Sequence, residues 1–209
     1  MNAPVIDRNT EALILDAARR VFIEKGMDGA RMQEIADLAG INKALLHYYF
    51  RTKEKLFNTI FNQSFGEFFS RMSILMASEK NILIKISSFI DTYMDLMLQN
   101  PFLPRFIITE INRNPQVVVE KFNAIGAEII RKNIRLLEKQ IKDEAQKGSI
   151  KYIDPKQLIS SIIALCLFPF LAEPLLRMLF FEGDKAKYEK YLKERKKVVE
   201  QIILDALKP

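Results

Sequence analysis

Hydrophobic residues recur three or four positions apart along most of the chain, and this spacing predicts amphipathic α-helices. The first helix is expected to begin at Asn9 or Thr10, either of which can cap it, and to stop at Gly26. Its apolar stripe consists of Ile14, Ala17, Ala18, Val21 and Phe22. The same reading predicts three further helices in the N-terminal part, over residues 32–39, 43–50 and 53–77.

The rest of the chain repeats one theme, long apolar-periodic helices separated by short breaks. Helices are predicted over residues 82–99, 105–112, 116–147, 154–181 and 185–207. Asp154 followed by Pro155 is a strong signal for the start of a helix, because an acidic cap precedes a proline at the first helical position. A backbone N–H at that position has no acceptor within the helix, so proline loses no hydrogen bond there. Pro169 and Pro174 are expected to kink the helix that contains them. Nine helices without a convincing strand predict an all-α fold.

Composition narrows the class of protein. Hydrophobic residues at 49% and charged residues at 28% exclude an intrinsically disordered chain. A single cysteine and a single histidine exclude an internal disulfide, and they exclude a zinc site made of these residues within one chain, so no metal is expected. The most apolar stretch, Leu158 to Ala172, is shorter than the ~20 residues that span a membrane, and residues 1–11 lack the apolar core of a signal peptide. A cytoplasmic protein without a membrane partner is expected.

The net charge of +6 mildly favours a polyanionic partner. The positions of the charged residues say more about a nucleic-acid partner than the net charge does, because basic and acidic residues nearly balance within residues 1–53. Two short helices separated by Gly40-Ile41-Asn42 have the spacing of a helix-turn-helix, whose second helix lies in the DNA major groove. Apolar residues of this segment suffice to pack the helices together. The residues left on the other faces of the second helix, all but Ala44 polar or aromatic, are then Asn42, Lys43, Ala44, His47, Tyr48 and Tyr49.

Lys53 stands in the first turn of the next helix, where the positive end of the helix dipole opposes a cation. The position is explained if the lysine and the N–H groups of that turn together hold a DNA phosphate. A solvated lysine offset by Glu54 is the alternative.

The segment from Met32 to Phe57, with Gly26 and Gly29 before it, closely resembles the DNA-binding region of the tetracycline-repressor (TetR) family of bacterial transcriptional regulators. The resemblance lies in the helix lengths, the turn at Gly40, the aromatic run ending in Phe50, and the pair of Lys53 with Glu54. It covers about residues 9–57, whereas the remainder is similar only in length and helical character.

The resemblance implies a homodimer that binds a near-palindromic operator and represses transcription until a small molecule enters the C-terminal domain. It implies a helix-turn-helix DNA-binding domain over residues 1–53, joined through the fourth helix to a ligand-binding and dimerisation domain over residues 54–209. On the family pattern Lys43, Ala44 and His47 face the groove, Tyr48 and Tyr49 reach bases or backbone, and Lys53 takes a phosphate. Two departures stand out. Arg31 replaces the usual hydroxyl cap and is assigned a phosphate contact, and His47 stands where a tyrosine is usual.

Dimerisation is expected on physical grounds as well, because one helix-turn-helix buries too little surface for tight binding, whereas two copies can occupy half-sites about 34–36 Å apart. The helix over residues 154–181 is apolar nearly all round and must be covered on several sides. As in the resembled family, it is predicted to form a four-helix bundle between subunits with the last helix. The interface residues predicted are Leu158, Ile162, Leu165, Phe168, Val198 and Ile202.

Aromatic residues and methionines crowd residues 82–182. Most serve the core, but with nearby polar groups they also suit an adaptable site for a hydrophobic or amphipathic effector. The candidate ligand-binding residues are Tyr93, Met97, Arg105, Phe106, Thr109, Glu110, Phe170 and Glu173. A buried glutamate favours a cationic ligand and a buried Arg105 favours an anionic or acyl one. No cofactor is expected.

Two other functions remain open. An enzyme is disfavoured, because the chain lacks a glycine-rich phosphate loop and the common hydrolase motifs. Its one histidine also lies in the predicted DNA-binding helix over residues 43–50. A helical carrier of hydrophobic molecules, whose DNA-binding head is unused, is the alternative. Cys166 lies between two leucines and is predicted to be a buried filler rather than a redox sensor.

Overall fold

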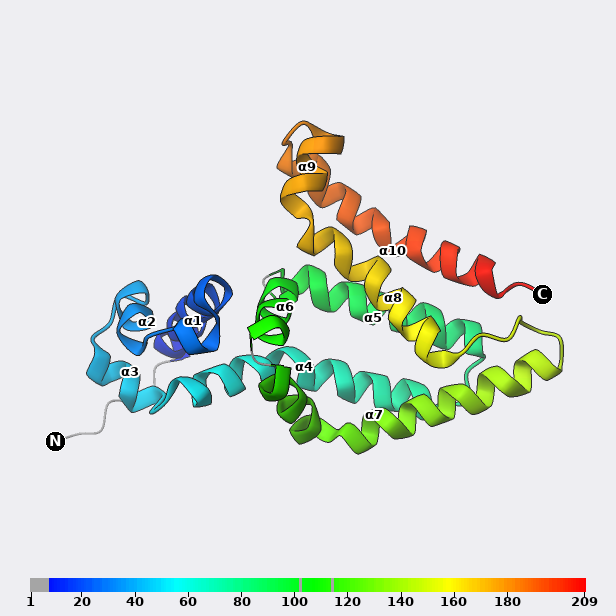
Figure 1. The fold of residues 1–209 in the computed structure, drawn as a ribbon, viewed down its shortest axis with the longest axis horizontal. Coiled ribbons are helices and arrows are strands. Elements are labelled where there is room, and N and C mark those ends of the chain that lie inside the picture. Colours follow the sequence, from blue (N-terminus) through cyan, green and yellow to red (C-terminus); the bar gives the residue numbers. More distant parts are fainter. Residues whose placement is uncertain (1–7, 102, 114) are drawn as a thin grey trace. The chain divides into compact units, whose positions relative to one another are not determined.

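The computed structural model describes residues 8–101, 103–113 and 115–209, and within these ranges it contains ten helices and no strand (Figure 1). The predicted all-α class is therefore confirmed. The helices are α1 (Arg8–Gly29), α2 (Met32–Leu38), α3 (Lys43–Tyr49), α4 (Lys53–Ala77), α5 (Ile82–Gln99), α6 (Leu103–Arg113), α7 (Pro115–Gln146), α8 (Pro155–Leu171), α9 (Glu173–Phe181) and α10 (Lys185–Leu207).

The extra helix arises because the predicted helix over residues 154–181 is two helices, α8 and α9, bent by 75°. Prolines cause the break. Pro169 and Pro174 lack the N–H that a continuous helix would donate to the carbonyls of Leu165 and Phe170. The N-cap predicted for this segment is confirmed, since the Asp154 side chain accepts hydrogen bonds from the N–H groups of Lys156 and Gln157.

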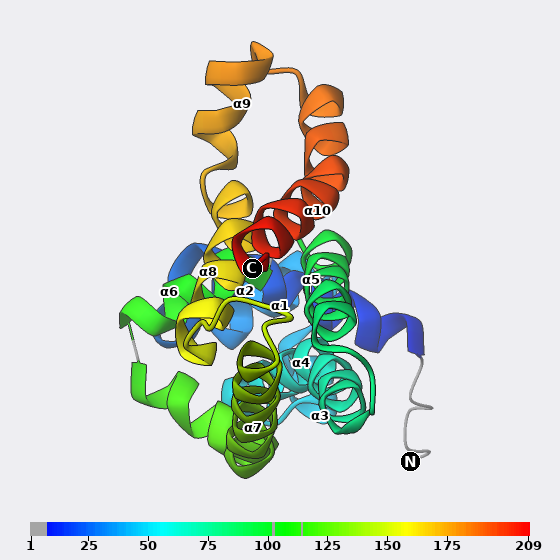
Figure 2. The same ribbon diagram turned by 90° about the vertical axis from the view of Figure 1, so that its right-hand side faces the viewer.

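Helix α10 supplies donors at the bend. The Nε and Nη2 atoms of Arg195 donate to the Leu165 carbonyl at 3.3 and 3.2 Å, and the Tyr188 hydroxyl donates to the Pro169 carbonyl at 2.6 Å. Tyr188 is 2% exposed, so its hydroxyl needs this partner. The bend is thus stabilised from α10. Figure 2 shows α9 at the end of the hairpin that α8 and α10 form.

Two glycines interrupt the longer helices. Gly26, at φ 71° and ψ 174°, breaks α1 where a stop is predicted, and one further helical turn follows to Gly29. Gly126, at φ 129°, breaks α7, and this break is not predicted. The apolar periodicity on the C-terminal side of Gly126 predicts one continuous helix, so the sequence pattern gives no sign of the break.

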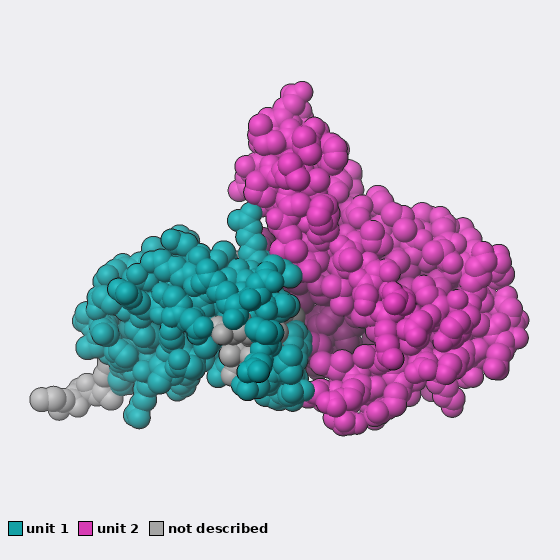
Figure 3. All heavy atoms as spheres, viewed as in Figure 1, with its two compact units in different colours: residues 1–66, 105–125 teal, residues 67–104, 126–209 magenta. Residues whose placement is uncertain are grey.

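The chain divides into two compact units, coloured separately in Figure 3. Unit 1 comprises residues 1–66 and 105–125, and unit 2 comprises residues 67–104 and 126–209. The predicted boundary at residue 53 therefore lies inside unit 1. In this unit Phe106 of α6 packs against Phe22 and Phe57, and Phe122 of α7 packs against Phe61. Sequence periodicity does not reveal such contacts between distant helices.

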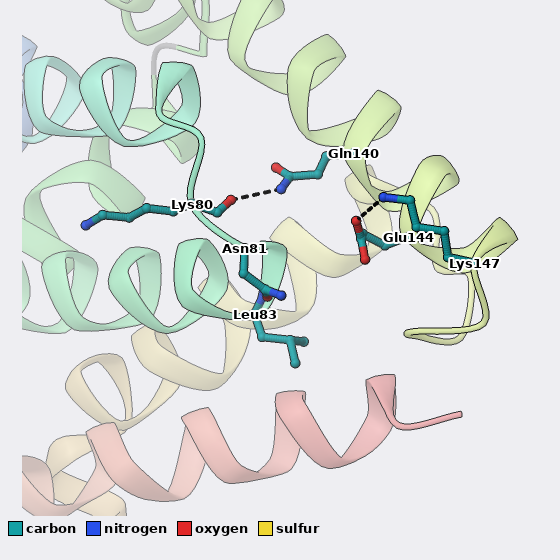
Figure 4. Close-up of polar contacts among 6 residues, drawn as sticks. All are labelled: Lys80, Asn81, Leu83, Gln140, Glu144 and Lys147. Carbon is teal, nitrogen blue, oxygen red and sulfur yellow. Dashed lines mark hydrogen bonds and ion pairs between the residues drawn. The ribbon is translucent and has the colours of Figure 1, made fainter.

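Each unit has its own core. In unit 1, Phe57 packs against Phe22 with ring centroids 5.6 Å apart and against Phe106 at 4.8 Å. In unit 2, α5, α8 and α10 pack together around four fully buried residues, Ile90, Met94, Cys166 and Val199. Gln140 of α7 donates through Nε2 to the Lys80 carbonyl at 2.9 Å, just before the Asn81 cap of α5 (Figure 4).

Among the described helices, none alone has the length and hydropathy needed to cross a membrane, although the bent pair of α8 and α9 meets those criteria when taken together.

Candidate nucleic-acid interface

Helix α3 is fixed at its N-terminus by the residue predicted to cap it. The Oδ1 atom of Asn42 accepts a hydrogen bond from the Leu45 N–H at 2.8 Å. Helix α2 begins instead after Arg31, whose side chain makes no cap hydrogen bond, as the absence of a hydroxyl at this position predicts. The guanidinium of Arg31 is therefore not used at the helix terminus.

The two faces of α3 differ in kind. Leu46 is fully buried and Phe50, at the C-cap, is 4% exposed, so these residues hold the helix on unit 1. The predicted DNA-binding residues lie on the other face. Asn42, Lys43, Ala44, His47 and Tyr48 are exposed, and Tyr49 is half-buried with its ring edge-on to Tyr48. A two-turn helix with one polar, aromatic face and one anchored face is suited to reading a groove.

His47 is oriented by the backbone. Its Nδ1 lies 3.1 Å from the Arg51 carbonyl, which can only accept a hydrogen bond. Nδ1 therefore carries the proton, and in the neutral ring Nε2 is an acceptor. An acceptor on the exposed face of α3 can take a hydrogen bond from the amino group of adenine or cytosine in the major groove.

Lys53 makes contacts that the sequence does not predict. Its Nζ donates to the carbonyls of Asp28 at 2.8 Å and Ala30 at 3.3 Å, which lie in the connection between α1 and α2. The Thr52 hydroxyl caps α4 by accepting from the Lys55 N–H at 3.2 Å. Lys53 therefore joins the start of α4 to the start of the helix-turn-helix, a role beyond the predicted phosphate contact.

A second cation also binds α1 to α2. Lys25 Nζ and Glu34 Oε1 form an ion pair at 2.8 Å. The hydrogen bond from Lys25 lowers the pKa of Glu34, and the same bond raises the pKa of Lys25. Both side chains are partly exposed, so the pair fixes geometry more than it contributes stability.

Helix α6 binds the break in α1 with two charged side chains. Glu110 is 0% exposed, and its Oε1 accepts from the Met27 N–H at 2.6 Å. Arg113 donates through Nη1 to the Lys25 carbonyl. These backbone groups flank Gly26, where a Cβ would lie 2.8 Å from Arg113 Cδ. We call Glu110, Arg113 and the backbone of residues 25–27 the α1–α6 clamp.

Burial raises the pKa of Glu110, while the hydrogen bond from Met27 acts in the opposite direction. Glu110 is a predicted ligand-binding residue because it is a polar group near the aromatic residues of this region. In the structure its carboxylate is buried and accepts a hydrogen bond from a backbone N–H of unit 1. Gly26 is the sequence signal for the break, but no local pattern could have indicated that α6 binds there.

The other predicted ligand-binding residues fall in both units. In unit 1, Phe106 is buried, Thr109 is half-buried and Arg105 is exposed. In unit 2, the buried residues are Tyr93, Met97 and Phe170. Burial raises the pKa of the Tyr93 hydroxyl, and its ring stacks on Phe89 at 6.1 Å. Glu173 pairs with Arg177 at 3.3 Å along α9.

The predicted dimer residues also divide. Phe168, Val198 and Ile202 are exposed and Leu165 is half-buried, so these can contact a partner. Leu158 and Ile162 are 1% and 2% exposed within the single chain and belong to its own core. A helix that is apolar on all sides does not reveal which side its own chain covers. Cys166 is buried, as predicted, and burial raises the pKa of its thiol to about 12.

Comparison with known proteins agrees with this geometry. Residues 14–60 match the model of the tetR family of bacterial regulatory proteins. The regulator RutR of Escherichia coli K12 is 24% identical over 94% of this chain and 89% of its own length. The fatty acid metabolism regulator protein of Bacillus subtilis is 25% identical over 66% of this chain and 69% of its own length.

Solved structures share the fold. The regulator FadR of Bacillus subtilis, in complex with stearoyl-CoA, superposes with a TM-score of 0.62 at 19% identity and covers 93% of this chain and 98% of that one. AibR, in complex with isovaleryl coenzyme A and operator DNA, gives a TM-score of 0.63 at 20% identity and covers 92% and 97%. These likenesses show a shared fold. The family match over residues 14–60, together with the curated regulators that resemble the chain, identifies it as a TetR-family transcriptional regulator.

Proposed function

We propose that two copies of the chain bind a near-palindromic operator and repress transcription in the cytoplasm until a small effector binds. The observation that carries the proposal is the exposed face of α3, where Lys43, Ala44, His47 and Tyr48 share one side of a helix anchored on the other. One such helix reads only a few base pairs. Two of them on half-sites about 34–36 Å apart provide the affinity of an operator-binding protein.

Residue roles follow from position. Lys43, Ala44 and His47 read base edges, and Tyr48 and Tyr49 contact bases or backbone beside them. Arg31 and Asn42 stand at the N-termini of the two short helices, where phosphates bind readily. Lys53 uses two of the three N–H groups of its ammonium on backbone carbonyls, and we assign the third to a phosphate.

The effector is proposed to be amphipathic, with an acyl chain as its apolar part. FadR and AibR, which share the fold, are recorded with acyl-coenzyme A molecules. The apolar interior of unit 2 suits such a chain, since it contains the buried, flexible side chains of Met94 and Met97 and the ring pair of Phe68 and Tyr93.

The clamp offers a route for the response. Helix α6 follows α5 of unit 2 in the chain and holds the α1 break in unit 1 through Glu110 and Arg113. An effector that favours one position of α6 would thereby favour one position of the helix-turn-helix, α2 and α3. Release from the operator requires only that the effector bind the two states with different affinity.

A selection of the purified chain on random duplex DNA at about 150 mM salt tests the DNA function. We expect a palindromic motif with half-sites about one helical turn apart. Lys43→Ala should change the preferred bases and serves as the matched variant. No enrichment from a folded dimer would favour the carrier function instead.

The effector is tested on the selected operator. Stearoyl-CoA should release the DNA, whereas free coenzyme A, which lacks the apolar chain, should not. Retention of the DNA with acyl-CoA of every chain length would refute the proposed effector class and leave the operator function intact.

A further inference from the structure

The ring of His47 is bound to the backbone just beyond its own helix. Its Nδ1 lies 3.1 Å from the carbonyl oxygen of Arg51, in the connection between α3 and α4. The first turn of α4 leaves this carbonyl open, because the Lys55 N–H donates to the Thr52 hydroxyl at 3.2 Å. The next N–H, that of Leu56, donates to the Thr52 carbonyl. The imidazole of His47 therefore takes the place of a missing backbone donor.

The Arg51 carbonyl decides which ring nitrogen of His47 carries the proton. A carbonyl oxygen only accepts, so Nδ1 must donate, and the neutral ring then has an unprotonated Nε2. The opposite tautomer would place two acceptors 3.1 Å apart. Within the described part of the chain Nε2 has no hydrogen-bond partner, and the side chain is exposed. Helix α3 thus presents a group that can only accept a hydrogen bond.

A group that only accepts divides the four bases into two classes. In the major groove, adenine and cytosine each present an exocyclic amino group that donates, whereas guanine and thymine present carbonyl oxygens that accept. Nε2 of His47 can bond the first two bases and meets the lone pairs of the other two. The hydroxyls of Tyr48 and Tyr49 both donate and accept, so these neighbours make no such distinction.

We propose that His47 makes each half-site specific for an amino-bearing base, adenine or cytosine, at one position, and rejects guanine and thymine there. The inference rests on the proposed operator binding and names the base chemistry that this residue selects. Lys43 has the opposite sense, because its ammonium only donates and favours guanine. It lies one helical turn earlier, about 5.4 Å, which exceeds the ~3.4 Å between successive bases. The two side chains therefore reach different bases.

The tautomer can be measured on the protein without DNA. His47 is the single histidine of the chain, so its signals need no assignment. At about pH 8, above the range in which histidines ordinarily titrate, nitrogen-15 NMR should show a protonated Nδ1 and an unprotonated Nε2. The couplings of the two nitrogens to the ring C–H protons tell them apart. A ring with its proton mainly on Nε2 would overturn the proposal.

Selection on random duplex DNA at about 150 mM salt measures the base preference. In each half-site of the wild-type motif, one position should favour adenine or cytosine over guanine and thymine by about 2–10-fold, the range of one hydrogen bond. The base recovered distinguishes adenine from cytosine. His47→Ala should lose this preference and keep the others. Lys43→Ala is the matched control, since it should alter a different position and leave this one unchanged.

Reversing the hydrogen-bonding sense of the side chain gives a sharper test. His47→Arg offers only donors and should favour guanine at this position, through O6 and N7. His47→Glu offers only acceptors and should keep the preference for an amino-bearing base, although its charge weakens binding to every sequence. Preference is a ratio of affinities within one variant, so a uniform loss of affinity cancels. An unchanged preference in His47→Arg refutes the proposal.

Removing the amino group from the DNA tests the same bond from the other side. Purine in place of the selected adenine, or 2-pyrimidinone in place of the selected cytosine, should weaken binding of the wild type by about 2–10-fold. His47→Ala should bind the original and the altered operator equally. An equal loss in both proteins would show that His47 does not contact the amino group.

The outcomes separate this inference from the operator function. If a palindromic motif is recovered but His47→Ala changes no position in it, the inference fails and the regulator stands. If His47→Ala weakens all sequences alike, the residue contacts a phosphate and the inference also fails alone. If a folded dimer recovers no motif, the proposed operator function fails and this inference fails with it.

Discussion

Replacing Glu110 by alanine should loosen the break in α1. The Glu110 carboxylate accepts a hydrogen bond from the Met27 N–H at 2.6 Å and is fully buried. A hydrogen bond to a charged group contributes about 1.5–3 kcal/mol, and removing the acceptor leaves the donor without a partner. A loss of about 2 kcal/mol corresponds to local opening about 30 times more often. We expect the Met27 amide to exchange its hydrogen faster by about that factor.

Amide hydrogen exchange of residues 25–31 measures this opening directly. Glu110→Gln keeps a carbonyl acceptor but removes the charge, so its Met27 amide should exchange at a rate between those of the alanine variant and the wild type. The amide of Val199, in α10 of unit 2, should be unaffected in both variants. If Met27 exchanges equally fast in the wild type and in Glu110→Ala, the clamp does not hold the break and the route proposed for the effector response is wrong.

The same residue predicts a pH dependence. Burial raises the pKa of Glu110 above its ordinary value of 4.5, so the folded chain binds this proton more tightly than the unfolded chain. The stabilising contribution is complete below pH 4.5 and is lost as the pH rises through the folded-state pKa. Carboxylates such as Glu34, whose pKa is lowered, give the opposite slope, so the informative quantity is the difference between variants. Relative to Glu110→Gln, the wild type should lose free energy of unfolding as the pH rises through this window.

Three further substitutions test other contacts. Lys43→Ala should change the base preference recovered by selection, whereas unchanged preference would remove Lys43 from the reading face. Lys53→Ala should weaken operator and unrelated DNA by a similar factor and lower the salt slope by about one, and a loss confined to the operator would contradict a phosphate contact. Tyr188→Phe removes only the hydroxyl that binds the Pro169 carbonyl at 2.6 Å. It should lower the free energy of unfolding in urea by about 1–2 kcal/mol, and an unchanged midpoint would show that the bend does not need this bond.

Local chemistry made much of the fold predictable. Helix limits follow from caps and breakers, which act within a few residues, and Asn42, Asp154 and Gly26 each do what the sequence indicates. The split between α8 and α9 was not predicted, although Pro169 and Pro174 marked it. A kinked helix and a broken one differ only in whether another element can satisfy the orphaned carbonyls. Those donors come from α10, about twenty to thirty residues away.

The candidate site was predictable for a different reason. On a two-turn helix, two anchors such as Leu46 and Phe50 decide which face is left open, so the exposed set on α3 follows from few residues. The dimer face was harder. Leu158 and Ile162 look like Phe168 in sequence, yet the chain buries the first two and exposes the third. Only the packing of α8 on α5 and α10 distinguishes them.

The break in α1 connects these features. A continuous helix satisfies its own N–H and C=O groups and leaves nothing for a neighbour to bind. Gly26 interrupts that ladder, and the backbone groups around it take partners from two other helices, Glu110 and Arg113 of α6 and Lys53 of α4. The break in α1 is thus the place where side chains of α4 and α6 bind the backbone of this helix. A shift of either helix would change these polar bonds, and α1 packs on α2, which in turn packs on α3.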